Sequence, residues 1–238
     1  MRYAILSDIH SNWEALEAVL DHLKKEKVHE CFVLGDTIGY GANPNECFTW
    51  MVQNAHAMVA GNHEKAMIDP LVLEWFNPTA REAAQWTARV LKPEFSEKIR
   101  LLNYLYANLF STLAHGSPDN PQEFRYLFSF EDARGSFQWF KTPICFVGHT
   151  HIPALFLEST ETVRFLKPGV NELERNERYI LNPGSVGQPR DRDPRLAFGI
   201  FDDKAWTFEV VRLEYDNQTA ATKIRKAGLP GCYADRLL

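Results

Sequence analysis

Residues that can bind metal ions follow short apolar stretches at five places in the chain. The five segments are Asp8-Ile9-His10, Gly35-Asp36, Gly61-Asn62-His63, His115-Gly116 and Gly148-His149-Thr150-His151. Such stretches are typical of buried strands, and in open α/β sheets ligands bind beyond the carboxyl ends of the strands. We therefore expect these side chains to meet at one edge of a sheet. The glycines agree with this, since a backbone that turns sharply beside a ligand leaves little room for a Cβ atom.

The distribution of histidines also favours a metal site. The chain has eight histidines, and most of them lie in these five segments. The exceptions are His22, His29 and His56, which lie in a predicted helix or before predicted strands and are expected to be solvated or to cap an element. One histidine at a strand end would be unremarkable in a protein core. Five of them, beside two aspartates and an asparagine, are poorly explained by chance.

The ligand types indicate the metal. Imidazole and carboxylate groups without a thiolate suit manganese, iron, zinc or nickel, with magnesium as an alternative, better than calcium. Seven candidate ligands are too many for one tetrahedral ion, so two divalent ions are expected. Asp36 is the candidate bridge, because each oxygen of a carboxylate can hold one metal.

The first sixty residues alternate between predicted strands and helices. Strands are expected at 3–7, 31–34 and 57–60, with helices at 12–25 and 44–54. Ser11-Asn12-Trp13-Glu14 has the form of a capping box in which Ser11 caps the first helix. Strands joined by helices over short links favour right-handed crossovers and a parallel sheet.

The remainder of the chain changes in character. Apolar residues at three- and four-residue spacing predict helices at 81–91 and 96–106, and further helices at 130–140 and 216–227. Predicted strands lie before His115, at 144–147, and then at 154–158, 162–166, 178–181, 196–201 and 206–215. The simplest organisation is one domain over residues 1–238, with a helical insertion at about 64–109 that caps the active site.

Composition and charge narrow the class of protein. Hydrophobic residues make up 45% and charged residues 24%, as in ordinary globular proteins, and the net charge is −5. An acidic balance disfavours a surface built for nucleic acid, and no stretch has the length of a membrane span. The four cysteines form no CxxC pair. We expect a cytoplasmic protein whose oligomeric state the sequence leaves open.

The five segments together resemble the signature of the calcineurin-like metallophosphoesterases. The family pattern is D-x-H, G-D, G-N-H with D or E, H, and G-H-x-H, and all five blocks occur here in order. The segments Gly39-Tyr40-Gly41 and Asn182-Pro183-Gly184-Ser185 look like the small bacterial and archaeal branch, which includes diadenosine tetraphosphatase and phosphodiesterase-like members. The resemblance implies an α/β fold, an αββα sandwich of two mixed sheets flanked by helices.

The resemblance also implies a role for each ligand. Asp8, His10, Asp36 and His151 would hold the first metal, and Asp36, Asn62, His115 and His149 the second. His63 would face the substrate outside the metal shell, together with Asn62, and either stabilise the phosphoryl oxygens or protonate the leaving group. Glu64, where relatives often have Asp, would accept a hydrogen bond from His63.

The expected reaction is hydrolysis of phosphomonoesters or phosphodiesters. Hydroxide held between the two metals would attack phosphorus in line with the leaving group, so no protein nucleophile is needed. Narrower substrates, such as dinucleoside polyphosphates or cyclic nucleotides, rest on family analogy. Alternatives are a metal-binding scaffold or regulatory protein without catalysis, and a nuclease, which the acidic charge disfavours.

Two groups of residues are candidates for binding the small phosphorylated substrate. Arg190 and Arg192 are candidate phosphate clamps, with surface charge as the equal alternative. Trp75, Phe76, Trp86, Tyr104 and Arg81 of the insertion could form a lid or stack on a nucleobase. The competing interpretation is that these aromatic residues form the core of the insertion itself.

Overall fold

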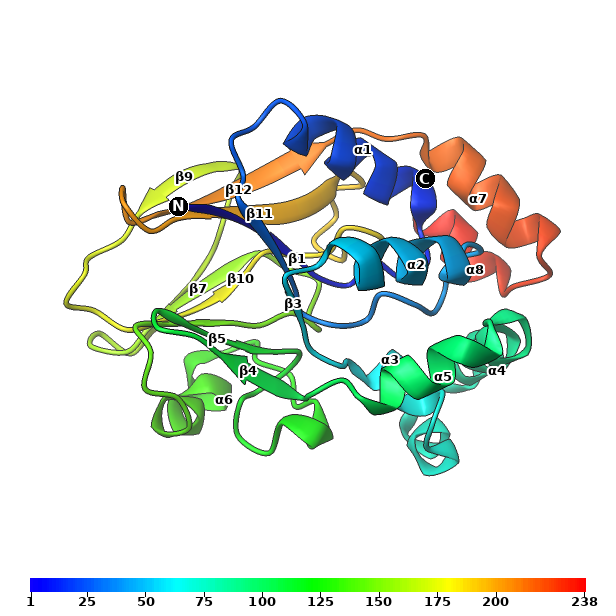
Figure 1. Ribbon diagram of the computed structural model, residues 1–238, viewed down its shortest axis with the longest axis horizontal. Helices are drawn as coiled ribbons and strands as arrows, with labels where there is room; N and C mark the ends of the chain where they lie inside the picture. The colour runs from blue at the N-terminus through cyan, green and yellow to red at the C-terminus, as the bar shows by residue number, and fades with distance from the viewer.

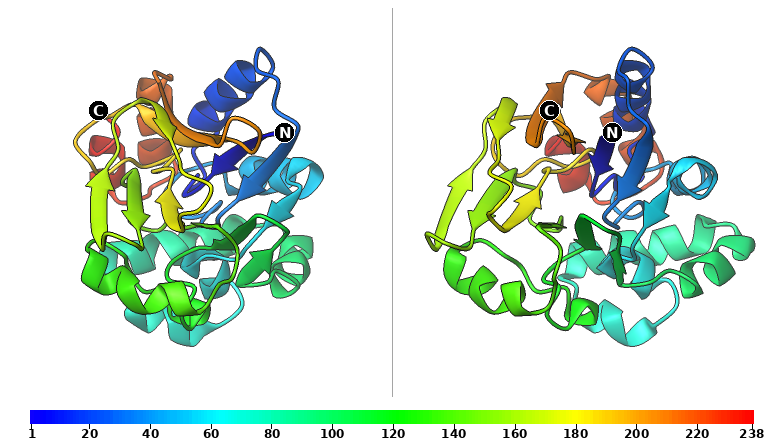
Figure 2. Two further views of the ribbon diagram at one scale, coloured as in Figure 1. Left: turned by 90° about the vertical axis from the view of Figure 1, so that its left-hand side faces the viewer. Right: turned by 60° about the vertical axis from the view of Figure 1, so that its left-hand side comes forward.

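The computed structural model covers residues 1–238 and consists of two six-stranded sheets with helices outside them (Figures 1 and 2). The first sheet has the order β3-β2-β1-β11-β12-β9 and the second β4-β5-β6-β10-β7-β8. The parallel strands are β1, β2 and β3 in the first sheet and β5, β6 and β10 in the second, and the other pairs are antiparallel. This confirms the expected αββα sandwich of two mixed sheets.

The strands of the first sheet are β1 (Arg2–Leu6), β2 (Glu30–Val33), β3 (Ala57–Met58), β9 (Gly169–Glu172), β11 (Leu196–Asp202) and β12 (Thr207–Leu213). Those of the second are β4 (Leu105–Ala107), β5 (Ser111–Ala114), β6 (Ile144–Phe146), β7 (Ala154–Leu157), β8 (Thr162–Phe165) and β10 (Tyr179–Asn182). The α-helices are α1 (Trp13–Leu23), α2 (Pro44–Asn54), α3 (Asn62–Ala66), α4 (Pro78–Val90), α5 (Pro93–Arg100), α6 (Phe130–Arg134), α7 (Asn217–Lys226) and α8 (Gly231–Asp235). Short 3-10 helices are η1 (Pro70–Trp75), η2 (Pro121–Glu123) and η3 (Gly135–Gln138).

The alternation of side chains along the strands builds the layers. In β1, Tyr3 and Ile5 point into the core between the two sheets, whereas Ala4 and Leu6 pack against α1 and α2. A strand buried on both faces reads as a continuous apolar run, which is why β1 carries no polar residue after Arg2. In Figure 1, α1 and α2 lie on the outer side of the first sheet, and α7 packs on α1.

The second sheet repeats this arrangement on the other side of the molecule. Ile144 and Phe146 of β6 enter the core between the sheets, while Cys145 packs with Phe130 of α6 and Phe137 of η3. The helix expected at 130–140 is therefore a short α-helix followed by a 3-10 turn. None of the helices is long and apolar enough to cross a membrane.

The start of α1 differs from the sequence-based expectation. Asn12, not Ser11, is the N-cap, and its side chain accepts a hydrogen bond from the Ala15 amide at 3.1 Å. Ser11 has a left-handed backbone (φ 54°), and its amide donates to the Thr37 carbonyl at 2.9 Å. Because that loop contact holds Ser11 outside the helix, Glu14 falls one position short of a capping box and pairs with Lys223 of α7 instead.

The predicted helix at 96–106 is also wrong beyond Arg100. Residues Leu105–Ala107 form β4, which pairs antiparallel with β5, placing Leu105 opposite Ala114. Pairing with a sheet edge here outweighs the helical spacing of the apolar residues. Strand β9 and helix α8 were not predicted. Helix α8 begins at Gly231, directly after Pro230, and packs with α7 and α4.

Candidate metal centre

The polar strand ends of both sheets meet between the sheets. Asp8 and His10 follow β1, Asp36 follows β2, and Asn62 begins α3 after β3. From the second sheet, His115 follows β5, and His149 and His151 follow β6. The predicted convergence of these residues is observed, with the sheets each supplying part of one centre.

Ligand atoms form three overlapping clusters. The clusters are Asp8, His10 and His151; His10, Asp36 and His63; and Asp36, His115 and His149, with the ligand atoms in each within 4.8 Å of one another. Asp36 belongs to two clusters. His63, expected outside the metal shell, lies close enough to share a cluster, its Nε2 being 4.0 Å from Asp36 Oδ2.

The ring nitrogens of three histidines are oriented by the backbone. Nδ1 of His10 lies 3.2 Å from the Ile38 carbonyl, Nδ1 of His115 lies 2.7 Å from that of Leu34, and Nδ1 of His151 lies 2.5 Å from that of Gln188. A carbonyl only accepts, so each Nδ1 carries a proton and Nε2 is the nitrogen that faces the centre. This is the tautomer that a metal requires.

The Nε2 atoms of His10 and His151 are 3.1 Å apart, and Nε2 of His151 is 3.1 Å from Asp8 Oδ1. Two lone pairs facing each other at this distance repel unless a cation lies between them. Asn62 Oδ1 is buried and has no hydrogen-bond partner in the protein. Buried polar atoms are rarely left unpaired. The donor set therefore fits divalent metal ions.

The charges of the buried carboxylates also favour a bound cation. Burial opposes the charge on Asp8 and Asp36, but the neighbouring histidines, His151 for Asp8 and His115 for Asp36, outweigh it and hold each carboxyl pKa well below its usual range. Burial likewise opposes a charge on His115, but Asp36 and Asp8 raise its pKa to about 9. The two carboxylates thus favour a positive charge at His115, whereas burial lowers the pKa of His10, His149 and His151.

The backbone of the centre is strained. The φ angles of Asp8, His10, Asp36, His149 and His151 are 53°, 49°, 51°, 67° and 61°. Non-glycine residues seldom adopt this left-handed region, and each costs on the order of 1–3 kcal/mol. Strain at five candidate ligands, each just after a strand, is typical of a functional site whose geometry the surrounding sheets impose.

Glycines allow the close approaches that the centre needs. A Cβ atom on Gly39 would lie 2.1 Å from Nδ1 of His63, and one on Gly61 would lie 2.1 Å from Oδ1 of Asp36. Gly39 also has φ +95°, which other residues rarely adopt. A larger residue at either position would displace the catalytic candidate beside it.

The expected pairing of Glu64 with His63 is wrong. The fully buried Glu64 carboxylate accepts hydrogen bonds from the amides of Asp36 (2.7 Å), Thr37 (2.8 Å), Ile38 (3.3 Å) and Gly61 (2.9 Å), and Nδ1 of His63 has no partner. Burial, followed by the charge of Asp36, raises the pKa of Glu64 to about 7. Glu64 therefore supports Asp36 through the main chain, and the extra methylene lets its carboxylate reach the loop after β2.

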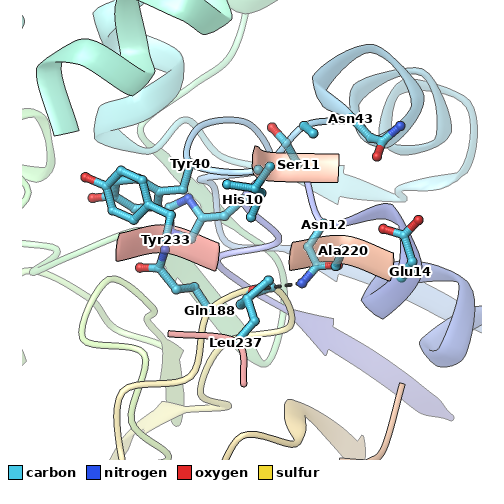
Figure 3. Close-up of a pocket in the computed structure, with 14 residues that line it drawn as sticks. His10, Ser11, Asn12, Glu14, Tyr40, Asn43, Gln188, Ala220, Tyr233 and Leu237 are labelled. Carbon is cyan, nitrogen blue, oxygen red and sulfur yellow. Dashed lines mark hydrogen bonds between the residues drawn. The ribbon is translucent and has the colours of Figure 1, made fainter. Parts of the chain in front are cut away.

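Several aromatic residues around the centre were not predicted from the sequence. The Tyr126 ring stacks on His149, with centroids 3.8 Å apart and planes inclined by 16°. Tyr40 lies 4.5 Å from the ring of His10 and 4.4 Å from that of His63. Figure 3 shows Tyr40 beside His10 and against Tyr233 of α8, at a centroid distance of 4.5 Å. Tyr40 stands in a segment that resembled the family; Tyr126 and Tyr233 had no signal.

The other candidates are divided between the centre and the rest of the protein. Phe76 lies 4.8 Å from the His63 ring, and Arg190 lies 6.0 Å from the Tyr40 ring. Trp86 packs on the cluster formed by α4, α7 and α8, and Tyr104 lies against Phe124. Arg81 donates to the carbonyls of Leu73 and Glu74, within the insertion.

Comparison with known protein families gives the context of this centre. The family model of the calcineurin-like phosphoesterase superfamily domain matches residues 1–205. The chain belongs to the calcineurin-like phosphoesterase superfamily. The match spans every polar strand end described above, so the resemblance inferred from the five motifs is confirmed.

The similar proteins cover nearly the whole chain. An uncharacterized protein of Methanocaldococcus jannaschii is 38% identical over 241 residues, which cover 98% of this chain and 96% of the relative. A crystal structure of a metallophosphoesterase from Sphaerobacter thermophilus is 39% identical, with a TM-score of 0.90 and coverage of 100% of this chain and 98% of that one. A hypothetical protein from Pyrococcus horikoshii, at 18% identity, has a TM-score of 0.82 and coverage of 99% and 97%, and shares the fold.

Proposed function

We propose that this protein is a metal-dependent hydrolase of phosphate esters, with two divalent transition-metal ions bound between the sheets. Asp8, His10, Asp36 and His151 would hold one ion, and Asp36, Asn62, His115 and His149 the other. The observation that carries the proposal is the convergence of buried carboxylate oxygens and ring nitrogens in three overlapping clusters, two of which share Asp36. Family membership, and the similarity to a metallophosphoesterase at 39% identity, support it.

Metal ions bound there would supply Lewis-acid activation of the ester and of the water that attacks it. The residues of the chain would then do the positioning. Asp36 is fixed by the Glu64 carboxylate at its own amide and by the His63 amide at its Oδ1, 3.0 Å away. His63 is the candidate for donating a hydrogen bond to a phosphoryl oxygen or to the leaving group. Asn62 would contact the same phosphoryl group.

Metal dependence tests this proposal. Protein stripped with a chelator and then supplied with manganese, iron, zinc, nickel or magnesium is expected to hydrolyse phosphomonoesters or phosphodiesters only after a metal is added. A panel containing nucleotide and sugar esters reports the ester class, and elemental analysis reports the metal content. Protein that binds no metal and hydrolyses nothing would instead support a scaffold role for this fold. Cleavage of single-stranded DNA in preference to small esters would support a nuclease.

Arg190 is the proposed phosphate clamp. Its Nε is buried without a partner, whereas its NH2 group donates to Gln188 Oε1 at 3.1 Å. Burial lowers the pKa of His151, the charge of Asp8 raises it, and the charge of Arg190 lowers it further. The guanidinium of Arg190 therefore lies close enough to act electrostatically on the centre. A partly unpaired guanidinium beside a metal centre suits a phosphate oxygen.

The variant Arg190→Ala is expected to lower kcat/KM roughly 10- to 100-fold, mainly through a higher KM, because a hydrogen bond to a charged group contributes about 1.5–3 kcal/mol. Arg175→Ala is the matched control. Arg175 donates to the carbonyls of Asp203 and Lys204, beyond the end of β11 that pairs with Arg2. It thus lies at the end of the sheet away from the centre. An unchanged KM in Arg190→Ala would remove Arg190 from the substrate site.

A further inference from the structure

A cavity of about 190 Å³ opens directly beside the proposed metal centre. Two candidate metal ligands, Asn62 and His149, form part of its wall. The rest of the wall is mainly aromatic, from Tyr40, Trp75, Phe76, Phe124 and Tyr126. An ester whose phosphoryl group contacts Asn62 would therefore place one of its substituents next to these rings.

The aromatic walls come from separate parts of the chain. Trp75 is the last residue of the 3-10 helix η1 and Phe76 follows it, whereas Tyr126 follows η2 in the connection between β5 and α6. Trp75 is 59% exposed and Tyr126 is 44% exposed. Trp75 is therefore not part of a core of the insertion, because a core would bury it. Large apolar surfaces that face a cavity at a site are typical of ligand contacts.

The rings are held in place before any ligand arrives. Tyr126 is fixed by its parallel stack on His149, and Nζ of Lys65 lies 5.5 Å from the centroid of the Trp75 ring. Phe76 packs on the His63 ring at 4.8 Å. Rigid aromatic walls reduce the entropy lost when a flat group binds between them.

The charge of the cavity limits what it can bind. Glu123 is the one charged residue in its wall, and its carboxylate pairs with Arg125 at 2.6 Å. None of the residues that line the cavity is a lysine or an arginine, so its wall itself offers no cation to a second phosphate. Its volume is below the roughly 300 Å³ at which drug-sized ligand sites begin, so it suits a single flat ring system.

We propose that this aromatic cavity binds the nucleobase of a nucleoside phosphate and so selects nucleotide esters over esters of simple sugars. The proposal rests on the proposed hydrolase function and names its substrate class. Every nucleobase has a flat π face, so any of the bases can stack on an aromatic side chain, whichever hydrogen-bonding groups it carries. One face of the base would meet Trp75 or Tyr126, with the phosphate held at the centre beside Asn62.

The test compares two esters that differ only by the base. On metal-loaded protein, kcat/KM for adenosine 5′-monophosphate is expected to exceed that for ribose 5-phosphate about 10- to 100-fold, as stacking on an aromatic side chain predicts. Trp75→Ala is expected to lower the value for the nucleotide at least tenfold more than that for the sugar phosphate, and Trp75→Phe to restore most of the preference. Trp139→Ala is the matched control, because Trp139 directly follows η3, is 58% exposed and does not line the cavity.

A second measurement does not depend on hydrolysis. Titration of the metal-loaded protein with adenosine is expected to quench tryptophan fluorescence to saturation, whereas ribose leaves it unchanged, and Trp75→Phe loses most of the quenching. Absent hydrolysis of every ester with adenosine still bound would contradict the hydrolase function and leave the base site standing. Failure of adenosine to bind, equal kcat/KM for the two esters, or a preference for phenyl phosphate over the nucleotide would overturn the base site.

Discussion

Replacing Asp36 with Asn is expected to lower kcat of the proposed ester hydrolysis by roughly 10³-fold or more, with a matching loss of bound metal. Asp36 is the residue that joins the two sheets' ligands: its Oδ2 lies 3.2 Å from Nε2 of His115 and 3.8 Å from Nε2 of His10. An amide can offer one neutral oxygen, whereas the carboxylate offers two oxygens and a negative charge. The variant would therefore remove the proposed bridge between the two ions while leaving the individual histidines in place.

The Asp36→Asn substitution is chosen so that loss of activity is not loss of fold. Oδ1 of Asp36 accepts from the His63 amide at 3.0 Å, and the oxygen of Asn can keep that bond. Cooperative urea unfolding in excess chelator checks this. Asp21→Asn, at an exposed residue of α1 that pairs with Lys24, is the matched control and is expected to keep full activity and metal. An Asp36→Asn protein with two bound metals and wild-type turnover would contradict both the bridge and the ligand assignment.

The centre could be predicted from the sequence because its ligands have a local signature. Each polar residue directly follows a run such as Tyr3–Leu6 or Ile144–Phe146, and strand direction alone brings such ends together. The same reasoning gave the βα units and the parallel strands. The residue types alone did not predict that the second sheet packs opposite the first. That prediction came from the family resemblance.

The predictions that were wrong depended on contacts between distant segments. Ser11 and Asn12 are both good helix caps, and the choice between them was made by the hydrogen bond from Ser11 to Thr37, across the loop after β2. The edge strand at Leu105–Ala107 exists because β5 is beside it. The stack of Tyr126 on His149 joins residues whose separation carries no sequence pattern. Side-chain periodicity reports local preference, and here packing between elements overrode it.

Glu64 is the clearest case of a residue whose chemistry was anticipated but whose partner was not. A carboxylate at this place in the motif was expected to orient an imidazole. Instead it fills the space between the loop after β2 and the start of α3, where four amide hydrogens converge. The loop that carries Asp36 has no other acceptor for the amides of Asp36 and Thr37, since Asp36 is left-handed and both amides point inward.

Glu64→Ala is accordingly expected to lower the free energy of unfolding by about 3–5 kcal/mol, because it leaves several buried amides unpaired and creates a cavity. Urea denaturation in excess chelator measures this without a contribution from metal binding. Glu97→Ala on α5, where the side chain is 81% exposed, is the matched control and should change stability by less than about 0.5 kcal/mol.

Glu64→Gln separates the hydrogen bonds from the packing. Glutamine has the same length and retains one acceptor oxygen. Its NH₂ group takes the place of the other carboxylate oxygen and therefore faces two amide N–H groups that lose their acceptor. These are the amides of Asp36 and Gly61 or those of Thr37 and Ile38, depending on which way the side-chain amide is turned. Its stability should fall between those of the native protein and Glu64→Ala. If the Gln variant were as stable as the native protein, the amides would not depend on the charge of Glu64. If Glu64→Ala matched Glu97→Ala, the carboxylate would not hold the Asp36 loop at all.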